Sequence, residues 1–268
     1  MDVLQAIILG VVQGITEFLP ISSSGHLILF PIIFGWEEQG VDFDVMIHLA
    51  TLLAILWMMR EDVKKTAHDV FAPGSSHLGA KILAATVPVV IVGVFIFGDL
   101  FESLRSIRVV AVNLMLWGAI LSIADFVATR VKPHVFDVHK TTWRQAIVIG
   151  CMQVFALLPG TSRSGVTIST GLFLGQDRPT TARFSFLLAI PAILGASVLT
   201  ILDVIQAGGF STSIPVLAAG FLSAFIAGSV AIKFLLKVLA HTHFQWFAAY
   251  RIALGAALLV YLALSSTG

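Results

Sequence analysis

The sequence predicts an all-α, polytopic membrane protein built from an inverted-topology repeat, with six transmembrane helices and two re-entrant helical hairpins. Of its 268 residues, 57% are hydrophobic and 12% are charged, and the mean hydropathy is +0.97. Soluble domains carry about 25% charged residues, so this composition excludes them. Apolar runs recur at close to the roughly 20 residues that cross the hydrocarbon core of a bilayer. Lysines and arginines occupy short loops, so no nucleic-acid partner is expected.

Two segments that lie 140 residues apart have similar sequences. Residues 10–25 read GVVQGITEFLPISSSG and residues 150–165 read GCMQVFALLPGTSRSG, with five identities in sixteen positions. The identical pairs are Gly10 and Gly150, Gln13 and Gln153, Ser22 and Ser162, Ser24 and Ser164, and Gly25 and Gly165. In each copy an apolar half-span is broken by Leu-Pro and a Ser/Gly turn, then followed by a short apolar stretch (27–34 and 166–174). Each copy therefore predicts a re-entrant helical hairpin.

Full membrane spans are expected between and after the two hairpins. We place them near residues 43–60, 79–98, 107–129, 183–203, 213–237 and 245–264. Residues 1–134 and 135–268 then each contain one hairpin and three spans, within one membrane domain. A hairpin returns to the side it entered and three is odd, so the second repeat starts from the opposite face. The hairpin tips should meet near the middle of the bilayer, where irregular backbone lines a cavity.

Basic residues orient the molecule, because short cytoplasmic loops are enriched in lysine and arginine. One predicted face receives thirteen: Arg60, Lys64, Lys65, Lys81, Arg130, Lys132, Lys140, Arg144, Arg178, Arg183, Lys233, Lys237 and Arg251. The other face receives only Arg105 and Arg108. The rich face is therefore expected to be cytoplasmic, with residues 131–142 inside and both termini outside. Small-residue runs at 195–197 and 255–257 permit close helix packing within a monomer or in a homo-oligomer.

Gln13 and Glu17 are the first polar pair of the first hairpin. They are four residues apart, so both side chains leave one face of the helix. A carboxylate at membrane depth costs at least about 2.5 kcal/mol on insertion scales and normally faces a polar cavity or an opposing charge. We favour a functional role over a carboxylate that reaches interfacial water from a shallow hairpin. Such oxygen ligands suit Mg²⁺ or Ca²⁺, so Glu17 and Gln13 are the candidate metal site.

Three serines and a histidine follow the break in the first hairpin. Ser22, Ser23 and Ser24 lie at the start of the second half-helix, where backbone N–H groups and the helix dipole favour an anion. His26 is three residues after Ser23 and four after Ser22, which predicts an imidazole and a hydroxyl at neighbouring positions of one helix face. Either Ser23 or His26 could supply the nucleophile, and the residues leave this choice open. Singly, these residues would be ordinary helix caps and a structural histidine; together they favour chemistry.

The second hairpin carries polar residues at the equivalent helix start. They are Thr161, Ser162, Arg163 and Ser164, with Thr167 four residues after the arginine. Arg163 is predicted to be the only basic residue deep in an apolar region. Its planar guanidinium matches a phosphate group in a bidentate manner, although Glu17 could instead be a purely structural partner. The two tips together predict a site for a phosphate ester or anhydride.

Two motifs in these hairpins resemble those of a known family. Residues 13–26, QGITEFLPISSSGH, and residues 159–167, PGTSRSGVT, resemble the signatures of the undecaprenyl-diphosphate phosphatases, also called bacitracin-resistance proteins. The resemblance covers the whole chain, including ARFSFLLAIP at 182–191. It implies a metal-dependent enzyme of the bacterial inner membrane that removes the terminal phosphate from a polyprenyl diphosphate lipid, so that the carrier returns to cell-wall synthesis. It also implies an active-site mouth on the outer face.

The resemblance also assigns positions. The family uses the positions of Glu17, Ser23, His26, Ser162, Arg163 and Thr167. Many members have glutamate where this chain has Gln13, which argues against a metal site with two carboxylates.

Two other classes of protein share features with this sequence. Type-2 lipid acid phosphatases share a PSGH element that residues 24–26 partly imitate, but they need a histidine several residues after Ser-Arg. Here the next histidine after Arg163 is His241, which excludes that class. A transporter of lipid or ions is the non-enzymatic alternative, because transporters also use inverted repeats with broken helices. Phosphate release and lipid movement in vesicles would separate these alternatives.

Overall fold

The computed structural model describes residues 1–268 apart from 71–75, 96–103, 105, 132, 240–241 and 266–268. Within the described residues the fold is all-helical, with a single isolated bridge between Val135 and Gln176 in place of any strand. The helices are α1 Val3–Phe18, α2 Ser23–Phe34, α3 Val41–Met58, α4 Arg60–His68, α5 Leu78–Phe95, α7 Ile107–Arg130, α8 Trp143–Gln153, α9 Arg163–Phe173, α10 Arg178–Gln206, α11 Ile214–Val238 and α12 Gln245–Ser265, with short 3-10 turns η1 Val138–Lys140 and η2 Val154–Leu157.

Six of the described helices are long and apolar enough to cross a membrane: α3, α5, α7, α10, α11 and α12. They confirm the six expected spans, although residues 96–98 of the second expected span lie outside the described residues. Helix α10 begins five residues earlier than expected, at Arg178. Its N-cap Asp177 accepts a hydrogen bond from the Thr180 amide, and Pro179 suits the first turn of a helix.

Helix α4 was not predicted, because its nine residues are too polar to read as a span. Its charges suit a helix in water. Glu61 and Asp62 lie in the first turn, while Lys65 and His68 lie in the last, so each pair faces the helix-dipole end of opposite sign.

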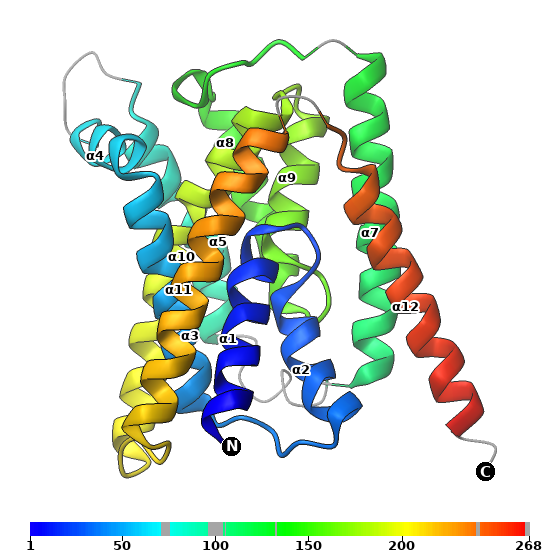
Figure 1. Ribbon diagram of the computed structural model, residues 1–268. Coiled ribbons are helices and arrows are strands. Elements are labelled where there is room, and N and C mark those ends of the chain that lie inside the picture. The colour runs from blue at the N-terminus through cyan, green and yellow to red at the C-terminus, as the bar shows by residue number, and fades with distance from the viewer. Residues whose placement is uncertain (71–75, 96–103, 105, 132, 240–241, 266–268) are drawn as a thin grey trace.

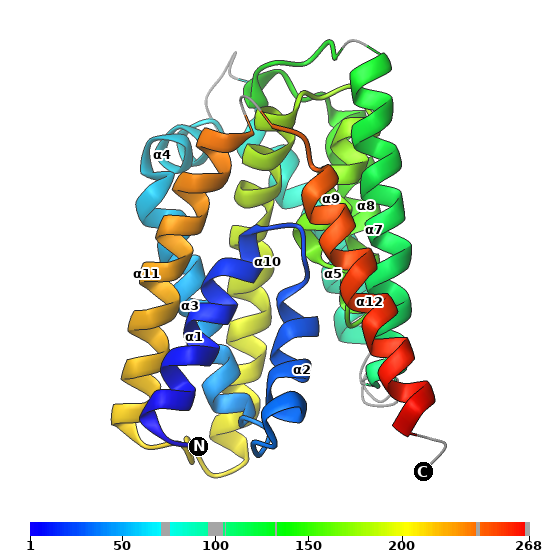
Figure 2. The same ribbon diagram turned by 45° about the vertical axis from the view of Figure 1, so that its right-hand side comes forward.

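Two helical hairpins occupy the positions of the duplicated segments. Helices α1 and α2 form the first, and α8 with η2 and α9 forms the second. Figures 1 and 2 show the first hairpin in the half of the molecule where the chain begins, and the second in the opposite half. The start of α1 and the end of α12 lie at one end of the molecule, whereas α4 lies at the other. The inversion of the repeats and their depth in a bilayer remain predictions.

The two hairpin tips share an unusual backbone geometry. Ser22 and Ser162 are the N-caps of α2 and α9, with φ of 78° and 72°. Positive φ is strained for a residue other than glycine, and such strain concentrates at functional sites. Each serine hydroxyl accepts the N–H of the glycine three residues later, Gly25 or Gly165. Equivalent sequence positions therefore have equivalent local structure.

Glycines fix the first hairpin against the bundle. A methyl group on Gly10 would lie 2.5 Å from the Gly220 carbonyl oxygen, and one on Gly14 would lie 2.5 Å from the Ala224 carbonyl oxygen. Helix α1 therefore packs backbone to backbone against α11. A methyl group on Gly255 would lie 2.6 Å from the Ala111 carbonyl oxygen, so this member of the small-residue run at 255–257 packs α12 on α7 within one chain. A homo-oligomer remains a prediction.

Candidate active site

Glu17 lies where the two hairpins meet. Its side chain is 7% exposed. One carboxylate oxygen, Oε1, accepts a hydrogen bond from Arg163 Nη2 at 3.0 Å. The other, Oε2, accepts from Ser23 Oγ at 2.7 Å and from Gln13 Nε2 at 3.2 Å. The structure thus gathers four of the predicted site residues around one buried charge, which satisfies the need of a carboxylate in a membrane protein for donors and a counter-charge.

Arg163, in the first turn of α9, uses only part of its hydrogen-bonding capacity. Nη2 donates to Glu17, Nη1 donates to the Ser185 carbonyl oxygen at 3.0 Å, and the buried Nε has no hydrogen-bond partner. A guanidinium has five N–H groups, so three remain for a ligand. The ion pair considered from the sequence is therefore present, and it leaves capacity to bind an anion.

Thr167 and Ser185 form hydrogen bonds with Arg163 and with each other. Thr167 Oγ1 is hydrogen-bonded to the Arg163 carbonyl oxygen at 2.9 Å and to Ser185 Oγ at 2.7 Å. Thr167 thus contacts the backbone of Arg163 and not its guanidinium. Sequence reasoning did not single out Ser185, which is fully buried on α10. Ser185 could have been found from the sequence, because its hydroxyl lies inside an apolar span, within the run 182–191.

His26 is hydrogen-bonded to two groups other than the Ser23 hydroxyl. Its Nδ1 lies 2.7 Å from the Ser22 carbonyl oxygen, and its Nε2 lies 2.7 Å from the hydroxyl of Tyr250 on α12. The two rings are nearly parallel, with an interplanar angle of 8° and centroids 5.8 Å apart. Both ring nitrogens are therefore engaged away from Ser23. Helical spacing places residues on a face but does not fix where a ring turns.

The remaining predicted serines build the tips and join them. In each tip the N-cap serine is hydrogen-bonded to the serine two residues later. Ser22 and Ser24 hydroxyls are 3.4 Å apart, and those of Ser162 and Ser164 are 3.2 Å apart. Ser164 also donates to the carbonyl oxygen of Leu19 in the first tip, at 3.1 Å. These hydroxyls define the shape of the site.

Arg251 corrects two expectations. From the sequence it was expected on the cytoplasmic face, and Arg163 was expected to be the only basic residue deep in an apolar region. Instead Arg251 is fully buried within α12, and its guanidinium donates to four backbone carbonyls. Their oxygens belong to Leu114 at 3.4 Å, Pro20 at 3.1 Å, Gly160 at 3.1 Å and Thr161 at 2.7 Å. Arg251 therefore joins both tips to α7 and α12. A lone arginine inside an apolar span was the signal to use, and the charge bias becomes twelve to two.

Two glycines and an asparagine allow the second tip to pack closely against its neighbours. A methyl group on Gly165 would lie 2.5 Å from Arg251 Nη1. Gly160 has φ of +86°, and a methyl group there would lie 2.6 Å from the Val110 carbonyl oxygen. Asn113 Nδ2 donates to the Pro159 carbonyl oxygen at 2.8 Å. The second tip is thus held closely against α7, while the predicted ligand Thr161 keeps a buried hydroxyl with no hydrogen-bond partner.

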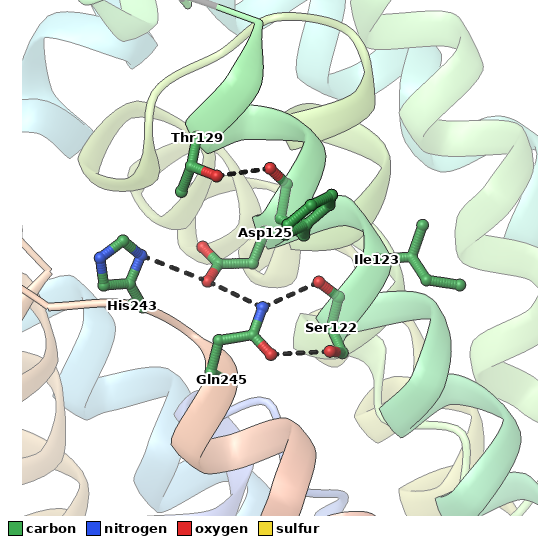
Figure 3. Close-up of a pocket in the computed structure, with 7 residues that line it drawn as sticks. Ser122, Ile123, Asp125, Thr129, His243 and Gln245 are labelled. Carbon is green, nitrogen blue, oxygen red and sulfur yellow. Dashed lines mark hydrogen bonds and ion pairs between the residues drawn. The ribbon is translucent and has the colours of Figure 1, made fainter.

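Two concave pockets among the described residues lie away from the tips. One, of about 460 Å³, is lined by Ser122, Asp125, His243 and Gln245, among others (Figure 3). Asp125 is fully buried there and accepts hydrogen bonds from Arg178 Nε at 2.6 Å and from the Phe244 amide at 3.1 Å. Its charge is therefore satisfied by structural donors that tie α10 and α12 to α7. No predicted site residue lines this pocket.

The side chains around Glu17 could bind a divalent metal ion. No group of three His, Cys, Asp or Glu side chains is placed to hold a metal among the described residues. However, Gln13 Oε1 is buried without a hydrogen-bond partner beside Glu17. A hard cation such as Mg²⁺ needs only one or two protein carboxylates, because it keeps waters and binds substrate phosphates. The residues present fit such an ion.

The fold and the site together define a class: a multi-pass α-helical membrane protein whose two hairpins join a carboxylate, a serine and an arginine at one buried polar site. Comparison with known proteins gives the family. The family described as "Bacitracin resistance protein BacA" matches residues 6–257, and the chain belongs to it.

Curated relatives match almost the whole chain. It is 43% identical over 267 residues to Undecaprenyl-diphosphatase 2 of Stutzerimonas stutzeri (strain A1501), covering 97% of this chain and 98% of the relative. It is 40% identical to the Undecaprenyl-diphosphatase of Marinobacter nauticus, covering 95% and 97%. A third relative, the Undecaprenyl-diphosphatase of Nitrosococcus oceani, is also 40% identical and is covered over 99% of its length.

Proposed function

We propose that this protein is a membrane phosphatase that hydrolyses undecaprenyl diphosphate to undecaprenyl phosphate and inorganic phosphate. The activity carries the family role, which is to recycle the lipid carrier for cell-wall synthesis and thereby confer bacitracin resistance. Membership of the family and the names of near full-length relatives support the activity. The site supplies the groups that the reaction needs.

The observation that carries the mechanism is the 2.7 Å hydrogen bond from Ser23 Oγ to Glu17 Oε2. A serine hydroxyl becomes a nucleophile when an adjacent base takes its proton. Ser23 Oγ bonds to the terminal phosphorus while its proton passes to Glu17. The anhydride P–O bond breaks, and its electron pair stays on the lipid monophosphate. Water then hydrolyses the phosphoserine, which releases phosphate and restores the hydroxyl.

The terminal phosphate would be bound by the second tip and by two helix N-termini. Arg163 has three N–H groups to offer, and its charge stabilises the negative charge that develops on the phosphoryl oxygens. Helices α2 and α9 both begin at the site, where their free N–H groups and dipoles favour an anion. The serine hydroxyls of both tips complete the cradle.

Glu17 and Gln13 Oε1 would hold the divalent cation, Mg²⁺ or Ca²⁺. Bound there, the ion would neutralise diphosphate charge. Mg²⁺ titration by calorimetry tests this without turnover: Gln13→Leu should weaken binding at least about tenfold, as for loss of a metal-orienting group. Gln206→Leu, at an exposed position of α10, should not change it. Equal affinities in the two variants would refute the site.

The protein is a multi-pass membrane protein, and we assign it to the bacterial inner membrane with the site open to the outer face. The basic residues support this orientation. Twelve belong to one predicted face and two to the other, and short basic loops stay in the cytoplasm. Both termini would then be external, on the side from which the first hairpin enters.

Phosphate release from undecaprenyl diphosphate by the purified protein tests the function. Ser23→Ala and Glu17→Gln should each lower the rate at least about a hundredfold, the scale for loss of one catalytic group. Ser265→Ala, at an exposed hydroxyl near the end of α12, should stay within about twofold. Lipid movement in vesicles with no phosphate release would overturn the proposal in favour of a transporter.

The chemistry of a trapped intermediate separates the two candidate nucleophiles. Acid quenching of a reaction with labelled terminal phosphate should leave acid-stable phosphoserine. Label that is lost in acid but kept in base would indicate phosphohistidine, and therefore His26 in place of Ser23.

A further inference from the structure

We propose that Tyr250 is a positioning residue, which holds the imidazole of His26 at one orientation and keeps its Nε2 hydrogen-bonded. The inference rests on the proposed function, because His26 matters only if the tips are an active site. It starts from the two short contacts of His26, 2.7 Å to the Ser22 carbonyl and 2.7 Å to the Tyr250 hydroxyl.

The first contact fixes the tautomer. A carbonyl oxygen can only accept a hydrogen bond, so Nδ1 must carry the hydrogen. In the neutral ring Nε2 is then an acceptor, and the Tyr250 hydroxyl must donate to it. If Nε2 is protonated, the same hydroxyl can rotate and accept. Tyr250 is therefore a partner that suits both protonation states of His26.

Burial gives the contact its importance. His26 is 5% exposed, so without Tyr250 its Nε2 would have no partner of comparable strength. A buried polar atom left without a partner is unfavourable, so the ring would turn away from its position to find one. Tyr250 is 44% exposed, and its ring lies parallel to the imidazole, with the two centroids 5.8 Å apart.

The neighbouring residue explains why Tyr250 stays in place. Arg251 follows it on α12 and is bonded to the carbonyls of Pro20 in the first tip and Thr161 in the second. These bonds fix α12 relative to the tips. The hydroxyl of Tyr250 is thus held at a constant distance from His26, while the ring itself only packs beside it.

The chain supplies a matched control, because Tyr261 is its only other tyrosine and lies exposed on the same helix. Tyr250→Phe removes one hydroxyl and keeps the ring. We expect kcat to fall about tenfold, the equivalent of about 1.4 kcal/mol, with KM within about twofold. Tyr261→Phe should match the wild type in both constants.

A double-variant cycle separates positioning from general support. In a His26→Gln background, Tyr250→Phe should have no further effect on kcat, because its partner is gone. In protein with ¹⁵N-labelled histidine, the Nε2 resonance of His26 should shift in Tyr250→Phe and not in Tyr261→Phe.

The outcomes are decisive in each direction. An active wild type with an equally active Tyr250→Phe variant would overturn this inference and leave the proposed function intact. The same loss from Tyr250→Phe with and without His26, or an unchanged Nε2 resonance, would also overturn it. A wild type that releases no phosphate would instead refute the proposed function.

Discussion

Replacing Arg251 by lysine removes the guanidinium that joins the two hairpin tips while it keeps the positive charge. The arginine reaches four carbonyl oxygens at 2.7 to 3.4 Å. A lysine ammonium is compact and would reach at most two of them, so at least two buried carbonyls lose their donor. Each loss costs about 1 to 3 kcal/mol in soluble proteins and about 0.6 kcal/mol on average in a membrane bundle. We expect a loss of stability of about 3 kcal/mol.

Thermal unfolding in detergent measures this effect. At about 2 to 4 °C per kcal/mol, the melting temperature should fall by about 10 °C. Arg183→Lys is the control, because Arg183 is 43% exposed and forms an ion pair with Asp62, and such surface pairs contribute about 0 to 1 kcal/mol. If Arg251→Lys has the same melting temperature as Arg183→Lys and the wild type, the tips do not depend on Arg251 and the reasoning fails.

Three further predictions concern charge. Arg163→Lys should lower phosphate release at least about tenfold in folded protein, because the ammonium cannot form the planar fork, and full activity would refute the fork. The Ser76 hydroxyl holds the pKa of Asp69 below its ordinary 3.8, so this carboxylate stabilises the fold at neutral pH and loses that effect as the pH falls through the lowered pKa. Asp69→Asn should therefore melt lower than the wild type at pH 7, and the difference should shrink as the pH falls through the lowered pKa; a constant difference would contradict this. In a cysteine-free background, an impermeant thiol reagent on whole cells should label Glu38→Cys and not Lys140→Cys, and the reverse would invert the topology.

The hairpins could be predicted because their signals are local. Pro20 breaks an apolar run, and the residues around Ser22 recur 140 positions later at Ser162. Both serines then adopt the same positive φ. The meeting of Glu17 and Arg163 could also be predicted, since a lone carboxylate and a lone guanidinium in apolar surroundings need each other.

Other contacts between distant segments could not be predicted. Tyr250 lies 224 residues from His26, and no periodicity links them. Arg251 was misplaced because counting charges treats each basic residue as a loop residue, whereas this one binds backbone carbonyls. The hydrogen-bond partners of His26 could not be predicted for a different reason, because helical spacing does not fix the rotation of a side chain.

The two tips are alike in backbone and unlike in chemistry. Ser23 and Arg163 occupy equivalent positions, as do Glu17 and Leu157, and His26 and Val166. In the proposed mechanism the first tip carries the groups that exchange protons, and the second carries the cation that meets the same carboxylate. An assembly of two identical halves would have had to carry both sets in each half. Within one chain the two tips need not be identical, so each can carry a different part of the proposed site.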